Sequence, residues 1–95
     1  MRKLKNGWVK GSVPDFLDLS DADREYMETR RALGRQVRAG RQEQGLTQTA
    51  LAARLQTSQS RVGKMEAADA SVTIDLLLQT LFRLGMERSE LAKAI

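Results

Sequence analysis

The chain has 95 residues and a mass of 10.6 kDa, which is enough for one small domain with a single hydrophobic core. Hydrophobic residues make up 41% and charged residues 29%, a balance typical of a folded, soluble protein. The sequence contains no cysteine and no histidine, which excludes zinc fingers, disulfide frameworks, cysteine nucleophiles and histidine-based triads. We therefore expect a protein that is not an enzyme and that holds no cofactor or metal ion.

The apolar runs of the sequence are far shorter than the roughly 20 residues that a transmembrane helix needs. The N-terminus is basic, but Gly11, Ser12, Pro14 and Asp15 occupy the stretch in which a signal peptide needs an apolar core. The sequence therefore predicts a cytoplasmic protein without a membrane segment.

The net charge of +4 is unevenly distributed along the chain. Residues 11–28 hold six acidic groups and one basic group, whereas residues 29–64 hold eight basic groups and one acidic group. Such a central basic block is typical of a phosphate-binding surface. The alternative is a solvated helix face that happens to be rich in arginine.

Helix caps and apolar spacing predict an all-α fold, because no alternating run of β-branched residues reaches strand length. Ser20, with Asp23 three residues later, is typical of the start of a helix, here a long one over about 21–44 that ends at Gly45. Thr47, Ser58, Thr73 and Ser89 predict four more helix starts, with helices over 48–55, 59–66 and 74–84 and a last one that carries Leu91 and Ile95.

The expected architecture is a compact five-helix, repressor-like domain with an N-terminal arm and a long first helix. Residues 1–28 form the arm and the start of the long helix, and residues 29–95 form the helix-turn-helix domain. Two eight-residue helices cannot be stable alone, so both must pack their small apolar faces against the remaining helices.

The segment from Gln48 to Ala67 has the features of a helix-turn-helix. Ala52 is small enough to let two helix backbones approach closely where they cross. Leu51, Val62 and Met65 supply apolar contacts beneath that crossing, and a short link sets a steep angle between the helices.

Three runs within this region carry a family resemblance: Gly45-Leu46-Thr47-Gln48, Leu51-Ala52-Ala53-Arg54-Leu55, and Thr57-Ser58-Gln59-Ser60-Arg61-Val62 followed by Met65-Glu66-Ala67. They resemble the phage-repressor/Cro or XRE family of DNA-binding proteins over roughly residues 33–85. The resemblance implies a repressor that binds a double-stranded DNA operator, and we expect a homodimer because one recognition helix buries too little surface for tight specific binding.

Two positions depart from the family pattern. Gln56 stands where family members usually have glycine, and a left-handed glutamine costs about 1 kcal/mol or more, so the turn is expected to be slightly altered. Gly63 lies within the second short helix, where glycine is about 1 kcal/mol worse than alanine. Gly63 would permit a close approach to DNA, but we interpret it first as a cost to stability.

The resemblance places the second short helix in the major groove, with its N-terminal residues at base edges. The implied DNA-binding residues are Gln48, Ser58, Gln59, Ser60, Arg61 and Lys64. Gln59 offers the bidentate pair that suits adenine, Ser60 and Lys64 face the groove, and Gln48 and Arg61 contact phosphates. The alternative for Gln59 and Ser60 is an ordinary solvated helix start.

The resemblance also pairs Arg41 with Glu66 across the domain, as a partly buried fork that ties the first helix to the end of the recognition helix. The acidic residues Asp15, Asp18, Asp21 and Asp23 suggest a metal site at first sight, but they lack the glycine and the terminal glutamate of a calcium loop. We interpret them as helix-start residues.

Three of the four aromatic residues, Trp8, Phe16 and Tyr26, precede the helix-turn-helix. Either the arm folds onto its own domain or it presents these side chains to another protein. With its Trp8-Val9, Phe16-Leu17 and Ser20-Asp21 pairs, the extension is similar to that of HigA-type antitoxins, whose partner is a RelE-like ribonuclease toxin. The alternatives are a stand-alone phage-type repressor and a protein-interaction module that has lost DNA binding.

Overall fold

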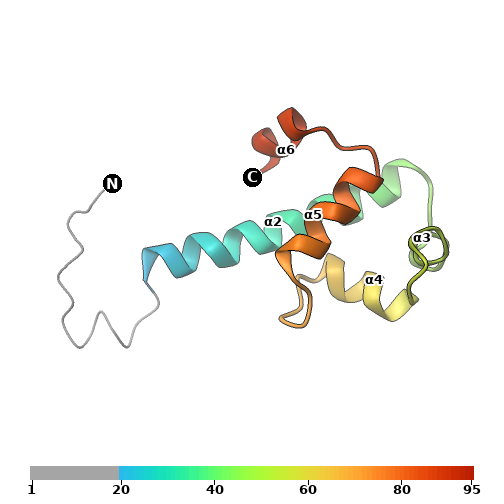
Figure 1. The fold of residues 1–95 in the computed structure, drawn as a ribbon, viewed down its shortest axis with the longest axis horizontal. Helices are drawn as coiled ribbons and strands as arrows, with labels where there is room; N and C mark the ends of the chain where they lie inside the picture. The colour runs from blue at the N-terminus through green and yellow to red at the C-terminus, as the bar shows by residue number, and fades with distance from the viewer. Residues whose placement is uncertain (1–19) are drawn as a thin grey trace.

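The computed structural model describes residues 20–95, and the predictions that concern the arm before Ser20 lie outside the described residues. Five α-helices follow one another in this part of the chain: α2 (Asp21–Glu43), α3 (Gln48–Leu55), α4 (Gln59–Glu66), α5 (Ile74–Arg83) and α6 (Arg88–Ala94) (Figure 1). The described residues contain no strand, so the predicted all-α fold is confirmed. None of these helices combines the length and the apolar character that crossing a membrane requires.

Side-chain caps begin the first four of these helices as the sequence predicts. Ser20 accepts a hydrogen bond from the backbone N–H of Asp23 at 3.0 Å, and the Asp23 carboxylate accepts from the N–H of Ser20 at 3.3 Å. Thr47, Ser58 and Thr73 each accept from the N–H three residues later, at 3.0, 3.1 and 3.1 Å. These hydroxyls satisfy backbone donors that have no partner within the helix.

The predicted cap of the last helix is wrong by two residues. Helix α6 begins at Arg88 with Glu87 as its N-cap, so Ser89 lies within the first turn. The reason is the acidic residue that follows: the Glu90 side chain accepts from the backbone N–H of Glu87 at 2.8 Å, which is the reciprocal half of a capping box. A glutamate three residues after the cap therefore outweighs a serine that lies two residues after it.

Helices α4, α5 and α6 pack against α2, and α3 packs against α4. The C-terminal half of α2 lies behind α5 and above α4 in Figure 1, α3 lies beside the start of α4, and the N-terminal half of α2 extends past the other helices. The core is aliphatic and draws on every helix except α6; its members are Leu33, Val37, Leu51, Ala52, Val62, Met65, Val72, Leu77 and Leu81. Burial of this hydrophobic core stabilises the short helices α3 and α4.

Four helix ends share one hydrogen-bond pattern. After α2, α3, α4 and α5 the chain turns through a left-handed residue, at Gly45, Gln56, Ala68 and Gly85, with φ of 70°, 60°, 53° and 100°. In each case the N–H of the left-handed residue and the N–H of the next residue donate hydrogen bonds to carbonyls of the preceding helix, at distances from 2.9 to 3.2 Å. This is the Schellman arrangement, in which glycine is the usual left-handed residue.

Candidate nucleic-acid interface

Helices α3 and α4 form the predicted pair of short, crossed helices. Leu51 and Ala52 of α3 are 0% and 3% exposed, and Val62 and Met65 of α4 are 0% and 1% exposed. These are the four apolar residues that the sequence assigns to the inner side of the motif. Their burial leaves the polar faces of both helices at the surface.

The link between these helices keeps its left-handed residue although glycine is missing. Gln56 has φ 60° and ψ 46°, and the N–H of Thr57 donates to the carbonyl of Ala52 at 2.9 Å. The expected alteration of this turn does not occur, because tertiary packing of the two helices imposes the geometry. The cost falls instead on Gln56, which carries about 1 kcal/mol of backbone strain.

A buried ion pair joins α2 to the end of α4, as the family resemblance implies. Nε and Nη2 of Arg41 donate to the two carboxylate oxygens of Glu66, at 2.5 and 3.2 Å, and Nη1 of Arg41 donates to the carbonyl of Leu46 at 2.8 Å. The two side chains are only 12% and 6% exposed. The hydrogen bonds that Arg41 donates to the Glu66 carboxylate raise the pKa of Arg41.

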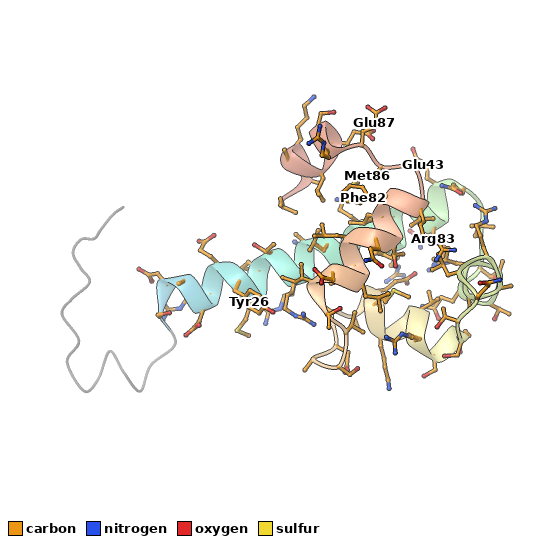
Figure 2. All side chains as sticks on the ribbon, viewed as in Figure 1. Tyr26, Glu43, Phe82, Arg83, Met86 and Glu87 are labelled. Carbon is orange, nitrogen blue, oxygen red and sulfur yellow. The ribbon has the colours of Figure 1, made fainter. Side chains whose placement is uncertain are left out.

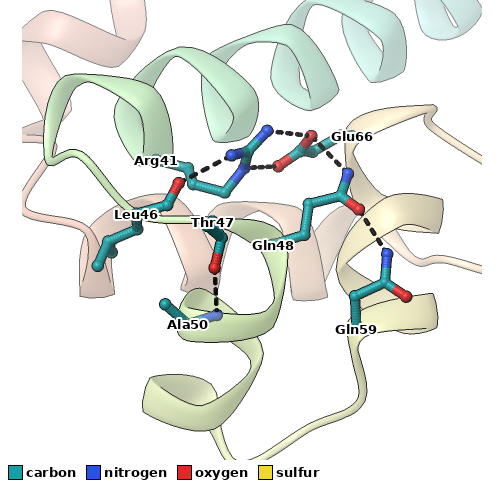
Figure 3. A network of polar contacts seen from close by, with 7 residues as sticks. All are labelled: Arg41, Leu46, Thr47, Gln48, Ala50, Gln59 and Glu66. Atoms are coloured by element: carbon teal, nitrogen blue, oxygen red, sulfur yellow. Dashed lines mark hydrogen bonds and ion pairs between the residues drawn. The ribbon is translucent and has the colours of Figure 1, made fainter.

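Two glutamines extend this ion pair to the surface (Figure 3). Nε2 of Gln48 donates to Oε1 of Glu66 at 3.1 Å, and Nε2 of Gln59 donates to Oε1 of Gln48 at 2.6 Å. Gln48 and Gln59 are the first residues of α3 and α4. The chain of contacts therefore fixes how both helix starts present their amides.

The sequence predicts roles for both glutamines separately but not their link. The signal that would have indicated it is positional: each glutamine is the first residue after a capping hydroxyl, Thr47 or Ser58. Two long amides at equivalent positions of two crossed helices are within reach of each other, but only the crossing geometry brings their atoms together.

The outward face of α4 is polar. Gln59, Ser60, Arg61 and Lys64 are exposed, while Ser58 is engaged as the helix cap. Gly63 lies between them, and a Cβ added there would meet only the side-chain amide of Gln48, at 3.7 and 3.9 Å. The surrounding residues therefore do not require a glycine, and the cost of about 1 kcal/mol in helix propensity stands.

A family model described as a helix-turn-helix domain matches residues 16–94. The chain belongs to this helix-turn-helix family. Comparisons with curated proteins and with solved structures gave no match. Helix-turn-helix domains are DNA-binding modules, so the family indicates a DNA-binding regulator.

In this helix-turn-helix protein the central basic block does not act as one surface. Arg41 is engaged with Glu66, and Nη2 of Arg30 donates to the carbonyl of Asp69 at 2.7 Å and to that of Val72. Nη1 of Arg54 donates to the side chain of Gln44 at 2.8 Å. Three of the eight basic residues thus hold segments of the domain together, and the other five, namely Arg31, Arg35, Arg38, Arg61 and Lys64, are exposed.

Gly34 of the helix-turn-helix domain is a position that sequence reasoning missed. A Cβ added to Gly34 would lie 2.8 Å from the carbonyl oxygens of both Met65 and Glu66, and 3.3 Å from the N atom of Ala68. These are backbone atoms, which cannot swing away as a side chain can. The end of α4 therefore rests directly on the backbone of α2.

Proposed function

We propose that the protein is a sequence-specific transcriptional repressor of XRE type, which binds a double-stranded DNA operator as a homodimer. The observation that carries the proposal is the linked pair Gln48–Gln59, at 2.6 Å, at the starts of the two helices of the motif. A glutamine amide held by a second amide loses less rotational freedom on binding a base, which favours recognition.

The residues divide into two roles. Gln59 and Ser60 read base edges at the start of α4, and Lys64 lies one turn further along the same helix. Gln48 contacts a phosphate with its backbone N–H and with the free hydrogen-bonding capacity of its side chain, and Arg61 contacts a phosphate beside the groove. Ser58 contributes through its capping hydroxyl, which places the first turn of α4.

A homodimer follows from size. Helix α4 has eight residues, and a single short helix in the groove buries less surface than specific DNA binding requires. Two copies on half-sites about one helical turn apart would supply the necessary contacts.

The test begins with selection of bound sequences from a random duplex library by the purified full chain. We expect a two-fold symmetric consensus with half-sites separated by about one helical turn. The Gln59→Ala variant should bind the consensus more weakly by about 1–3 kcal/mol and lose preference at one base pair per half-site. Failure to enrich any sequence, with the protein folded, would support an interaction module that has lost DNA binding.

Two controls separate recognition from folding. Gln59 is exposed, so the melting temperature of Gln59→Ala should match that of the wild type. Arg61→Ala should weaken binding to the consensus and to random DNA alike, because a phosphate contact carries no sequence information. Equal loss of preference in both variants would show that Gln59 does not read bases.

We further propose that this repressor is the antitoxin of a type II toxin–antitoxin pair that regulates its own operon, with a RelE-like ribonuclease as its partner. The support is apolar surface on the half of α2 that extends past the domain: Tyr26 is 54% exposed and Met27 is 37% exposed (Figure 2). Exposed aromatic and methionine side chains are enriched at protein interfaces.

Co-expression with the product of the adjacent gene would test this second part. The antitoxin role predicts a stable complex, relief of growth arrest, and weaker complex formation by Tyr26→Glu without loss of operator binding. If the neighbouring product is not a ribonuclease and does not bind, the protein is a stand-alone repressor.

A further inference from the structure

Three exposed arginines of α2 form a surface that the helix-turn-helix motif does not include. Arg31, Arg35 and Arg38 are spaced by four and three residues, so they lie on one face of the helix. We call these three residues the arginine face. From Arg31 to Arg38 it extends about 10 Å at 1.5 Å per residue, which is about three base-pair steps of DNA.

The arginine face borders the recognition helix. Gly34 lies three residues after Arg31 and four before Arg38, and therefore next to both on the helix surface. At Gly34 the backbones of α2 and α4 approach so closely that an added Cβ would be 2.8 Å from two carbonyl oxygens of α4. The long arginine side chains on either side of this contact start beside α4 and can reach past it.

A chain of contacts connects the helix that carries the arginine face with the linked glutamines. Arg41, three residues after Arg38, binds Glu66, and Glu66 accepts from Gln48, the residue assigned to a phosphate contact. A DNA backbone that passes Gln48 would continue along α2 towards Arg38 and Arg31.

Of the three residues of the arginine face, only Arg31 forms an ion pair with a carboxylate of the described residues. Arg31 forms an exposed ion pair with Glu28 at 3.0 Å, and such a surface pair contributes little. Arg35 and Arg38 form no ion pair with any residue from Ser20 to Ile95. Clustered guanidinium groups without counter-charges attract phosphates, which they bind bidentately.

We propose that the arginine face is a second phosphate-binding surface, which contacts the DNA backbone outside the groove that α4 enters. This inference rests on the proposed function. It assigns part of the sequence's central basic block to DNA without any role in reading bases, so its contribution is the same for every DNA sequence.

The experiment compares salt dependence of DNA binding, measured by fluorescence anisotropy, for the wild type and for Arg35→Gln/Arg38→Gln on random duplex DNA and on the selected operator. Loss of two phosphate contacts should make the log-log salt slope shallower by about two per subunit, and should weaken binding about five- to tenfold per arginine near 0.1 M salt. The base preference should not change.

Two matched variants make the result specific. Arg83→Gln/Arg88→Gln removes the same charge from the exposed surfaces of α5 and α6 and should change the slope by less than half as much. Arg35→Lys/Arg38→Lys keeps the charge and should restore the slope. Circular dichroism melting confirms that each variant is folded.

DNA binding by the wild type tests the proposed function, whereas the salt slope of Arg35→Gln/Arg38→Gln tests the inference. If the wild type binds no DNA, the proposed function fails and the inference fails with it. If the wild type binds the operator but Arg35→Gln/Arg38→Gln has the same slope, only the inference is overturned, because Arg35 and Arg38 then contact no phosphate. An equal effect of Arg83→Gln/Arg88→Gln would also overturn it, since net charge alone would then be responsible.

Discussion

The two helices of the helix-turn-helix motif, α3 and α4, end differently from α2 and α5. The left-handed residue that follows α2 is Gly45, and the one that follows α5 is Gly85. After α3 and α4 the left-handed residues are Gln56 and Ala68. The hydrogen bonds at the four ends are alike. The difference therefore lies in the residue and not in the geometry: only the ends of α3 and α4 carry the strain of a side chain at positive φ, about 1 kcal/mol each.

This difference shows where local sequence determines the structure and where tertiary contacts do. Gly45 and Gly85 favour their turns without help, and a Cβ added to either would meet nothing within 4 Å. Ala68 does not favour its turn, but α4 rests on Gly34, and Arg30 holds the carbonyl of Asp69 at 2.7 Å just beyond it. About 2 kcal/mol of strain in the motif is a substantial share of the roughly 5–15 kcal/mol of a small domain.

The largest expected effect comes from breaking the contact that imposes the end of α4. Gly34→Ala should destabilise the domain by about 2 kcal/mol or more, because the new Cβ would lie 2.8 Å from two backbone oxygens. This is opposite in sign to the usual gain of about 1 kcal/mol for alanine within a helix. Urea denaturation followed by circular dichroism would measure it.

Gly40→Ala is the matched control on the same helix. Its Cβ would lie 3.4 Å from Cδ1 of Leu84, a flexible side-chain end, so stability should change by less than about 1 kcal/mol. If Gly34→Ala were as mild as Gly40→Ala, α4 would not rest on α2 as described.

Glu66→Ala should rank next. It leaves the Arg41 guanidinium, only 12% exposed, without its carboxylate, and it releases Gln48. We expect a loss of about 2–4 kcal/mol in the free energy of unfolding, since breaking a buried pair is costly. The same change in Arg41→Ala and in the double variant would confirm that one interaction is lost, whereas additive losses would contradict a direct pair.

Substitutions at the four left-handed residues test the strain at each helix end. Gln56→Gly and Ala68→Gly should each stabilise the domain by up to about 1 kcal/mol, and Gly45→Ala and Gly85→Ala should each destabilise it by a similar amount. Thermal unfolding of the four variants would check the signs. Destabilisation by Ala68→Gly would mean that its methyl group contributes more through packing than its φ costs.

The smallest effect concerns the loop after α4 and appears at acid pH. Hydrogen bonds from the hydroxyl and the N–H of Ser71 lower the pKa of the exposed Asp69 carboxyl. A lowered folded pKa means that Asp69 contributes stability above its unfolded pKa, and that this contribution is lost as pH falls through the folded value. In Ser71→Ala the pKa of Asp69 should move up towards its usual value, and an NMR titration that shows no shift would contradict the contact.

The helices and most of their limits can be predicted from the amino-acid sequence. Capping hydroxyls at Ser20, Thr47, Ser58 and Thr73 act on neighbours three residues away, and the apolar spacing identified Leu51, Ala52, Val62 and Met65 as inner residues; both depend on local geometry, which a sequence displays. The Arg41–Glu66 pair was predicted by family resemblance rather than by spacing. The cap at Ser89 failed because Glu90 competed for the same helix start.

The remaining features depend on how the helices pack against one another. That Gly34 must be glycine, that Gln56 and Ala68 are left-handed, and that Gln48 bridges Glu66 to Gln59 all depend on where a second helix lies. The different roles of the basic residues also depend on packing. On α2, Arg41 binds the Glu66 carboxylate, whereas Arg38, one turn before it, is exposed to solvent. Residues far apart in the chain meet only after packing has fixed the crossing of the helices, and no local preference encodes that crossing.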